Sequence, residues 1–291
     1  MNSIRTIKIF INLRRDENLT NKLETIFRYL YVKVIKYIGV SRILSMRGRR
    51  DIKFLMYPGC TISEKMYVVG MYDYDGMMSI LKLINKDDVF FDIGANVGPF
   101  SLLAGKIGAS VVSFEGHPKT LERLKDNLKL NEMNTSGAIN MIVSSNLGSM
   151  YFTNDVGSAE NKVSVSKNSS NIEVPCISID SYCNTNMYPT FVKIDTEGHE
   201  LEVIKGMKNV LKEVKYISFE ANGLSERKDL AEIYSLLNKN GFTVGNIDWS
   251  TKQFYALSDL GDKSKTGDYH AVSTALIDIL LKKENFKLVQ V

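Results

Sequence analysis

The feature that most constrains the fold is a segment near residue 90, Asp88-Asp-Val-Phe-Phe-Asp-Ile-Gly-Ala-Asn-Val-Gly-Pro99. Its bulky apolar run at residues 89–91 has no polar alternation, which favours a parallel strand covered on both faces. Gly94 and Gly98 then permit a tight loop, and Pro99 suits the first turn of a helix. We predict a strand, a glycine loop and a helix, an arrangement that binds ligands above the carboxyl end of the strand.

The spacing within this loop indicates the kind of ligand. A dinucleotide-binding loop would read Gly-x-Gly-x-x-Gly, but Asn96 stands at the position of the second glycine. Asp92 directly before the turn suits a ligand with ammonium and hydroxyl groups, such as S-adenosylmethionine (SAM), better than a diphosphate. Glu115 ends the next apolar run, 23 residues after Asp92, and an acidic residue roughly 20 residues on commonly binds ribose hydroxyls. Both features predict nucleotide binding.

Three segments together form a set of motifs: Phe91-Asp-Ile-Gly-Ala-Asn-Val-Gly-Pro-Phe-Ser101, Ser113-Phe-Glu-Gly-His-Pro118 and Val192-Lys-Ile-Asp-Thr-Glu-Gly-His-Glu200. With these motifs in this order, the chain resembles the FkbM family of SAM-dependent O-methyltransferases. The resemblance runs from Tyr72 to near the C-terminus. One departure is Gly116, where the family usually has a proline. The resemblance implies a Rossmann-like class I methyltransferase fold of the α/β class. Its mostly parallel seven-stranded sheet would have helices on both faces and a terminal antiparallel hairpin.

The resemblance also implies site residues. The expected cofactor-binding residues are Asp92, Gly94, Asn96, Gly98, Ser101, Glu115 and, at the mouth of the site, Tyr72, with Asp73 as a further candidate. Asp195 is expected to act as base or to orient the acceptor, His199 is the second choice, and Glu197 would be a metal ligand beside Asp195. Structural roles compete, since Asp195 ends a predicted strand and His199 begins a helix. The implied reaction is SAM-dependent methylation of a hydroxyl of a saccharide or secondary metabolite.

A dedicated metal site has little support in the sequence, so the expected metal is none. The three histidines are isolated, and neither His-Glu-x-x-His nor a cysteine cluster occurs. Mg²⁺ held by Asp195 and Glu197 together with the substrate stays open. Glu220 and Asn222 follow the next predicted strand, where they would either bind sugar hydroxyls or serve the structure.

Two other functions stay open. One is an NAD(P)-dependent oxidoreductase on a similar fold, which Asn96 disfavours. The other is a non-catalytic nucleotide-binding scaffold that docks through a basic N-terminus. The hypothesis that the protein methylates nucleic acid has less support, because the sequence has no base-clamp motif. We expect no nucleic-acid partner.

The basic charge is concentrated at the N-terminus. Residues 1–53 hold thirteen Lys or Arg and four Asp or Glu, a net charge of +9, whereas the rest of the chain carries −5. We therefore predict a basic helical extension at residues 1–53 and the methyltransferase domain at residues 54–291. Apolar residues at helical spacing over residues 19–38 predict an amphipathic helix. It would pack on the core, form a homodimer with a second copy, or lie peripherally on an anionic membrane.

Cysteine usage and the N-terminal residues indicate a cytoplasmic location. Cys60, Cys176 and Cys183 form no C-x-x-C motif, which argues against a disulfide framework or a zinc knuckle. Arg5 and Lys8 interrupt the first apolar stretch, so it is a poor signal peptide. No uncharged run approaches the ~20 residues of a membrane span.

The other apolar patterns predict alternating strands and helices. Strands are expected at residues 110–115, 139–143, 191–194, 216–220, 242–247 and 271–281, with a long loop around 261–267. Helices are expected at residues 72–84, 100–107, 230–237 and after residues 118 and 200. A turn at Pro58-Gly59 predicts a hairpin over residues 53–70 beside the site. The polar stretch 151–175, with a short strand at 163–166, is either a lid or a solvated hairpin.

Overall fold

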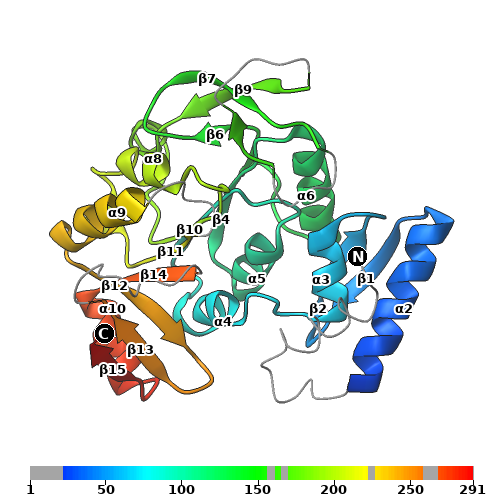
Figure 1. The fold of residues 1–291 in the computed structure, drawn as a ribbon, viewed down its shortest axis with the longest axis horizontal. Helices are drawn as coiled ribbons and strands as arrows, with labels where there is room; N and C mark the ends of the chain where they lie inside the picture. The colour runs from blue at the N-terminus through cyan, green and yellow to red at the C-terminus, as the bar shows by residue number, and fades with distance from the viewer. Residues whose placement is uncertain (1–21, 156–160, 165–169, 222–226, 258–267, 291) are drawn as a thin grey trace.

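The computed structural model describes residues 22–155, 161–164, 170–221, 227–257 and 268–290 (Figure 1). The strands of its central sheet are β3 (Val89–Ile93), β4 (Ser110–Phe114), β5 (Ala138–Ile139), β10 (Phe191–Ile194), β11 (Tyr216–Glu220), β12 (Phe242–Asp248), β13 (Gln253–Ala256), β14 (Asp268–Ser273) and β15 (Lys287–Gln290). Their spatial order is β15-β13-β12-β14-β11-β10-β3-β4-β5. The strands from β5 to β11 run parallel, and β14 pairs antiparallel with both β11 and β12.

Helices cover both faces of this sheet. α4 (Tyr74–Leu83), α5 (Pro99–Ile107), α6 (Pro118–Leu130) and α10 (Thr274–Lys282) contribute to one core, and α7 (Ile179–Cys183), α8 (Glu200–Lys205) and α9 (Arg227–Lys239) to the other. Neighbouring strand residues alternate between the two cores. Phe90 and Phe191 belong to the first, whereas Phe91 and Val192 belong to the second. This alternation explains the uninterrupted apolar run that the sequence shows in β3.

The predicted α/β fold, a mostly parallel sheet with helices on both faces, is confirmed, and β3, β4, β10, β11, α5 and α9 lie where the patterns predict them. The described sheet has nine strands rather than seven, because β13 and β15 extend it beyond β12. The expected antiparallel pair at the C-terminal end is β12 with β14. The long loop around residues 261–267 lies outside the described residues.

The segment at residues 53–70 is not the hairpin that we predicted. β1 (Arg42–Met46) and β2 (Arg49–Met56) pair with each other instead, and α3 (Thr61–Val68) follows the turn at Pro58-Gly59. Ser63 and Met66 are buried on this helix, three residues apart, as helical packing requires. A helix therefore covers this side of the site. Because β2 crosses residue 53, the division into extension and domain at that residue stays a prediction.

The strand predicted at residues 139–143 is interrupted. β5 ends at Ile139, and β6 (Ile142–Val143) pairs with β9 (Ile172–Ile177) in a separate sheet. The side chain of Asn140 donates hydrogen bonds to the carbonyl oxygens of Glu115 and Gly116, both at 2.8 Å. These bonds hold the chain at the point where it leaves the central sheet.

The strand predicted at residues 271–281 is also wrong from residue 274 onward. β14 ends at Ser273, and α10 begins at the next residue. Leu276 and Leu280, four residues apart, are the two buried residues of α10. The apolar run therefore follows the helical period, which a continuous strand would not satisfy.

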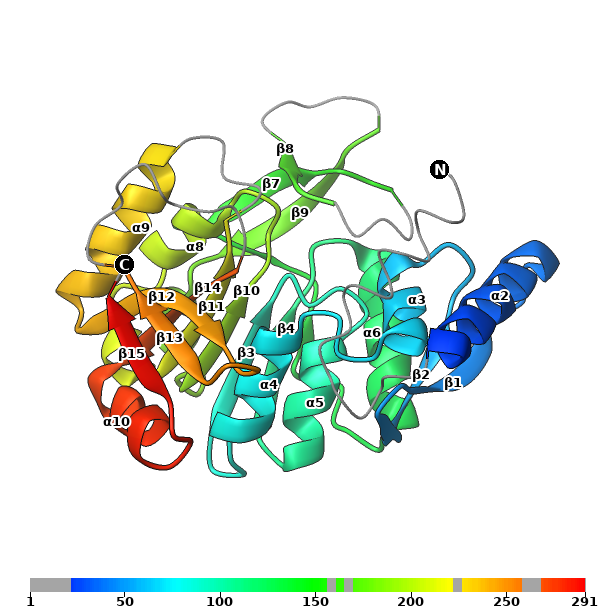
Figure 2. The ribbon, with the colours of Figure 1, turned by 60° about the horizontal axis from the view of Figure 1, so that its bottom comes forward.

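The polar stretch at residues 151–175 belongs to a second, four-stranded sheet. Its strands are β6, β7 (Gly148–Phe152), β8 (Val163–Ser164) and β9, in the order β6-β9-β7-β8. Figure 2 shows this small sheet beyond the ends of the central strands. Of the short strand predicted at residues 163–166, the first two residues form β8, and residues 165–169 lie outside the described residues.

The amphipathic helix predicted near the N-terminus is present as α2 (Lys22–Ile38), and residues 19–21 lie outside the described residues. It packs beside α3 at the outer edge of the molecule (Figures 1 and 2). In the described part of the chain, every helix is either too short or too polar to cross a bilayer.

Asn127 of α6 and Asn131, the C-cap of this helix, attach the N-terminal hairpin to the domain. Asn127 Oδ1 accepts a hydrogen bond from the Leu55 N–H at 2.8 Å, and Asn127 Nδ2 donates to the Val97 carbonyl at 2.8 Å. Asn131 bonds both backbone groups of Lys53, which lies on the same strand, β2. The amide side chains thus satisfy backbone groups that the pair β1–β2 leaves free.

We expect Asn127→Ala to lower the free energy of unfolding by about 2 kcal/mol, because the Leu55 N–H and the Val97 carbonyl lose their partner inside the protein. Urea denaturation with an unchanged m-value would measure the loss. The matched control is Asn186→Ala, on an exposed asparagine, for which a change below about 0.5 kcal/mol is expected. Equal effects of the two substitutions would contradict the attachment role of Asn127.

Candidate functional site

A cavity of about 390 Å³ lies at the carboxyl ends of β3, β4 and β10. It brings together eight of the ten predicted site residues: Tyr72, Asp92, Gly94, Asn96, Glu115, Asp195, Glu197 and His199. Gly98 and Ser101 do not line it. Other walls come from Ile62 and Lys65 on α3 and from Phe152 and Val163 on the small sheet. Elements far apart in the sequence therefore meet at one site.

Asp92 is held in place by the first turn of α5. Its Oδ2 accepts hydrogen bonds from the Ser101 N–H at 3.0 Å and from the Ser101 hydroxyl at 2.6 Å. Burial raises the pKa of Asp92, and the charge of Lys193 opposes this rise. Ser101 is fully buried, so its observed contact is with Asp92 and not with the cavity. Gly98 forms the left-handed N-cap of α5, with φ of 87°.

The glycine loop and the loop after β10 touch backbone to backbone. Gly94 has φ of 77°, and a Cβ atom there would lie only 1.9 Å from the carbonyl oxygen of Asp195. The Asp195 N–H also donates to the Ile93 carbonyl at 3.0 Å. Only glycine meets both the backbone angle and the close approach. The loop that carries Asp92 is thereby fixed against the loop that carries Asp195.

Glu115 connects the second strand to the glycine loop. Its Oε1 accepts a hydrogen bond from the His117 N–H at 2.8 Å, and its Oε2 accepts one from the Asn96 N–H at 2.9 Å. Burial raises the pKa of Glu115 to about 7, and these backbone hydrogen bonds oppose the rise. Asn96 adopts the left-handed conformation, with φ of 51°, which asparagine tolerates better than most residues. Two backbone groups thus orient the carboxylate that the sequence assigns to the ribose.

Lys193 is a site residue that our sequence analysis missed. It lies on β10 two residues before Asp195, with its Nζ 2.8 Å from Asp195 Oδ2 and 4.7 Å from the centre of the Phe100 ring. Burial lowers the pKa of Lys193, but the charges of Asp195 and Asp92 outweigh it and raise the pKa above its ordinary value. A lysine two positions before an aspartate on a strand shares its face, and this spacing could have revealed the pair.

Asp195 stays ionised because of Lys193. Burial raises the pKa of Asp195, but the charge and hydrogen bond of Lys193 bring it below its ordinary value. The carboxylate can therefore accept a hydrogen bond from a hydroxyl group at neutral pH. This favours an orienting role for Asp195 over that of a strong base.

His199 and Glu197 line the cavity from the loop before α8. His199 Nε2 lies 3.0 Å from the Ser144 hydroxyl, and burial lowers the pKa of the imidazole. The imidazole is therefore neutral at pH 7 and able to take up a proton. Glu197 adopts the left-handed conformation, with φ of 55°, which costs about 1 kcal/mol or more for a residue of this type. The loop tolerates this strain at the cavity wall.

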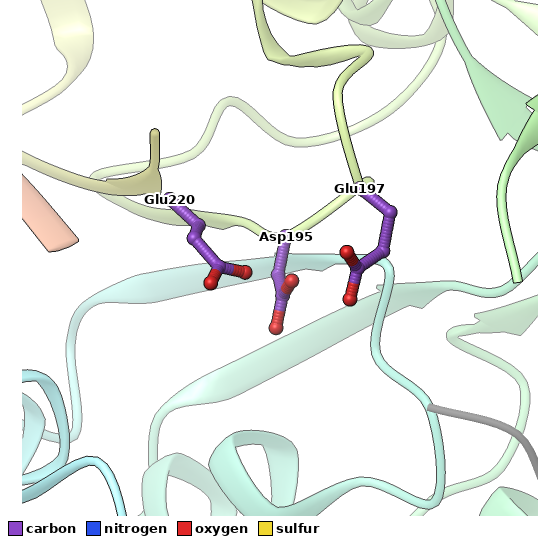
Figure 3. A group of neighbouring side chains, drawn as sticks. All are labelled: Asp195, Glu197 and Glu220. Atoms are coloured by element: carbon purple, nitrogen blue, oxygen red, sulfur yellow. The ribbon is translucent and has the colours of Figure 1, made fainter. Parts of the chain in front are cut away.

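Three carboxylates gather where β10 and β11 end. Oxygen atoms of Asp195, Glu197 and Glu220 lie within 4.8 Å of one another, and Figure 3 shows the three side chains directed into the same space. Carboxylate oxygens at this spacing are suited to a divalent cation. Glu220 joins the pair that the sequence singled out, while Asn222 lies outside the described residues.

Asp268 and Asp73 complete the acidic wall. Asp268, at the start of β14 opposite Glu220, was missed in the sequence because the expected strand began only at residue 271. Burial, reinforced by Asp73, raises the pKa of Asp268 to about 7. Asp73 caps α4 by accepting a hydrogen bond from the Gly76 N–H at 3.2 Å, and burial raises its pKa to about 6. Tyr72 lies beside it, with the Lys65 ammonium 5.3 Å from its ring centre.

The polar stretch at residues 151–175 contributes to the site, because Phe152, Asn161 and Val163 line the cavity. These contacts favour the lid over the solvated hairpin. Loops that cover a ligand commonly combine apolar and amide side chains in this way.

The charge of the cavity selects its ligand. Among the described lining residues, seven are acidic and two are lysines. The acidic residues are Asp73, Asp92, Glu115, Asp195, Glu197, Glu220 and Asp268. A cationic ligand gains electrostatic energy here, whereas a diphosphate is repelled. SAM, with its sulfonium and ammonium groups and its ribose hydroxyls, fits these side chains.

Glu115 should make the ligand-free protein less stable as the pH rises. Its pKa is about 7 in the folded chain and 4.5 when exposed, so its stabilising contribution is full below 4.5 and is lost as the pH passes 7. His270, whose pKa burial lowers from 6.5 to about 3, acts in the opposite direction. We expect the difference in unfolding free energy between wild type and Glu115→Gln to shift by on the order of 3 kcal/mol from pH 4 to pH 8.

Urea denaturation over this pH range would measure that difference, because His270 contributes equally to both proteins and cancels. Parallel pH profiles for wild type and Glu115→Gln would contradict the raised pKa of Glu115.

Known proteins resemble the chain in sequence and in fold. It is 31% identical over 181 residues to the hexuronic acid methyltransferase AglP of Haloferax volcanii, which covers 60% of this chain and 74% of that protein. A shorter match, 37% identical over 57 residues, links 20% of the chain to 17% of the tRNA (guanine(37)-N(1))-methyltransferase Trm5b of Pyrococcus abyssi. The crystal structure of methyltransferase FkbM from Methylobacillus flagellatus KT is 17% identical, with a TM-score of 0.45, covering 92% of this chain and 58% of that one.

The family model described as the methyltransferase FkbM domain matches residues 92–244. This range begins at the aspartate before the glycine loop and includes Glu115, Lys193 and Asp195. It spans more than half of the chain. The predicted family is therefore confirmed: the chain belongs to the FkbM methyltransferases.

Proposed function

We propose that this methyltransferase transfers the methyl group of SAM to a hydroxyl group of a saccharide. The observation that carries the proposal is the acidic cavity in which Asp92, Glu115 and Asp195 meet around the Gly94 loop. The cofactor is S-adenosylmethionine. Glu115 accepts hydrogen bonds from the ribose hydroxyls, and Asp92 with the glycine loop receives the cationic part of the cofactor.

The residues around Asp195 prepare the acceptor. When bound, SAM supplies an electrophilic methyl carbon and a neutral thioether leaving group. Asp195 accepts a hydrogen bond from the acceptor hydroxyl and aims its oxygen, which is the positioning that in-line transfer needs. Lys193 keeps this carboxylate ionised. His199, which is neutral because burial lowers its pKa, takes up the proton that the hydroxyl loses when its oxygen bonds the methyl carbon.

A saccharide suits the rest of the cavity. Glu197, Glu220 and Asp268 present carboxylate oxygens from three different segments, and such oxygens commonly bind sugar hydroxyls. The relative from Haloferax volcanii is called a hexuronic acid methyltransferase, which supports a sugar acceptor. A nucleic acid would bring phosphates to a wall of carboxylates, so it is disfavoured.

The two alternative functions are less well supported. A nicotinamide dinucleotide carries a diphosphate, which the acidic cavity repels. A non-catalytic scaffold is disfavoured because Asp195 lines the same cavity as Asp92 and Glu115. The carboxylate of Asp195 therefore lies where an acceptor bound in this cavity can reach it.

Calorimetry should show that SAM binds and NADH does not. We expect Glu115→Ala to weaken SAM binding at least about tenfold, because the ribose hydroxyls lose a charged hydrogen-bond partner. Glu122→Ala, on an exposed residue of α6, is the matched control and should leave the affinity unchanged. Binding of NADH in place of SAM would refute the proposed cofactor.

Asp195→Asn should lower turnover about 10²-fold to 10⁴-fold and change the SAM dissociation constant by less than about threefold. The asparagine keeps the shape of the side chain but replaces the carboxylate, whose charged oxygen accepts the hydrogen bond from the acceptor hydroxyl, with a neutral amide. Turnover is measured as the methylated saccharide formed from SAM, with Asp87→Asn, on an exposed aspartate, as the control. Unchanged turnover in Asp195→Asn would remove this residue from the acceptor site.

A further inference from the structure

The outer face of α2 exposes a continuous set of apolar side chains. Leu23, Phe27, Leu30, Val34 and Tyr37 follow one another at alternating spacings of four and three residues, and each exposes between 50% and 94% of its surface. Ile38, Val40 and Ile43 continue this surface onto β1, each exposed by at least 42%. We call these eight residues the α2 patch. An exposed apolar patch of this extent normally contacts another molecule.

The opposite face of α2 is fixed to the body of the protein. Arg47, only 2% exposed, donates from Nη1 to the Thr25 hydroxyl at 2.7 Å and to the Val68 carbonyl at 2.8 Å. Lys36 pairs with Glu64 of α3 at 2.6 Å. The helix is thus rigidly mounted, and its apolar outer face is not turned toward the core.

α3 connects this mounting to the cavity. It packs on α2, while its Ile62 and Lys65 line the cavity. Figures 1 and 2 both show α2 at the outer edge of the molecule with α3 on its inner side. A surface bound by the α2 patch would therefore lie one helix away from the cavity wall.

The charge around the α2 patch indicates which kind of partner the patch contacts. Residues 22–50 hold eight Lys or Arg and one Asp or Glu. Three of these basic residues, Lys36, Arg47 and Arg49, pair with Glu64, Glu24 and Asp51. Of the other basic residues, Lys22, Lys33, Arg42 and Arg50 are exposed. A second copy of the chain would bring the same charge and be repelled, whereas a surface of anionic lipids attracts it. The aromatic rings of Phe27 and Tyr37 suit the boundary between headgroups and acyl chains.

We propose that the α2 patch docks the protein peripherally on an anionic lipid bilayer. The apolar side chains enter the headgroup boundary, and the surrounding lysines and arginines bind lipid phosphates. Because docking involves neither the cofactor nor the acceptor, it is independent of the proposed function. A failure of methyl transfer and a failure of docking are therefore measured separately.

Co-flotation of the full chain with lipid vesicles tests the proposal. We expect binding to vesicles of equimolar phosphatidylglycerol and phosphatidylcholine, and at least about tenfold weaker binding to phosphatidylcholine alone. The triple variant Phe27→Ser, Val34→Ser, Tyr37→Ser should weaken binding at least about tenfold, because three apolar side chains no longer enter the headgroup boundary.

The matched control changes three exposed apolar residues elsewhere, Leu147→Ser, Met187→Ser and Tyr188→Ser, and should bind as wild type. A charge variant, Lys22→Glu, Lys33→Glu, Arg42→Glu, should lose the preference for anionic vesicles and keeps the test valid if the serine triple folds poorly. Wild-type binding by both the serine and charge variants would overturn the proposal. A second result would also overturn it: the wild type does not bind vesicles, forms a dimer in sedimentation velocity, and the serine triple variant is monomeric. That result would assign the α2 patch to contact with a second copy of the chain.

Discussion

The buried ammonium of Lys193 is the interaction on which the site depends. It lies 2.8 Å from Asp195 Oδ2, and the charges of Asp195, Asp92 and Asp73 all raise its pKa against the effect of burial. These carboxylates come from β3, from the end of β10 and from the cap of α4. Without a cation among them, their mutual repulsion would oppose the packing that forms the cavity, because buried like charges are costly when unpaired. One lysine thus allows an acidic site for a cationic cofactor to exist inside a folded protein.

Backbone contacts add the precision that charge alone lacks. Gly94 packs against the Asp195 carbonyl, and the Asn96 N–H holds Glu115. Both contacts join loops that follow neighbouring parallel strands, so the register of the sheet fixes the relative positions of the residues proposed to bind the cofactor and the acceptor. Motion of one loop would require motion of the next. The cofactor side of the cavity is therefore preorganised before any ligand binds.

The outer walls have another origin. α3 precedes the residues that match the family model, whereas the small sheet lies within them, and these two elements supply Ile62, Lys65, Phe152 and Val163. In the proposed function, these walls would select the acceptor, while the residues at the strand ends would carry the chemistry. The same α3 supports the basic, apolar α2 patch. The part of the cavity wall that α3 supplies and the proposed membrane-facing surface thus belong to one N-terminal layer.

Local patterns in the sequence determined the central strands, the glycine loop and the family, because periodicity, glycine positions and motif spacing act over a few residues. They were sufficient to select Asp92, Glu115 and Asp195, which the structure brings to one cavity. They did not predict that the chain leaves the central sheet after Ile139. They also did not predict the helices at residues 61–68 and 274–282. Those outcomes depend on partners distant in the sequence, such as the backbone oxygens of Glu115 and Gly116 that hold Asn140. Only the tertiary structure brought Lys193, Asp268 and Glu220 to one cavity, because burial and charge pairing between distant segments are properties of the packed chain.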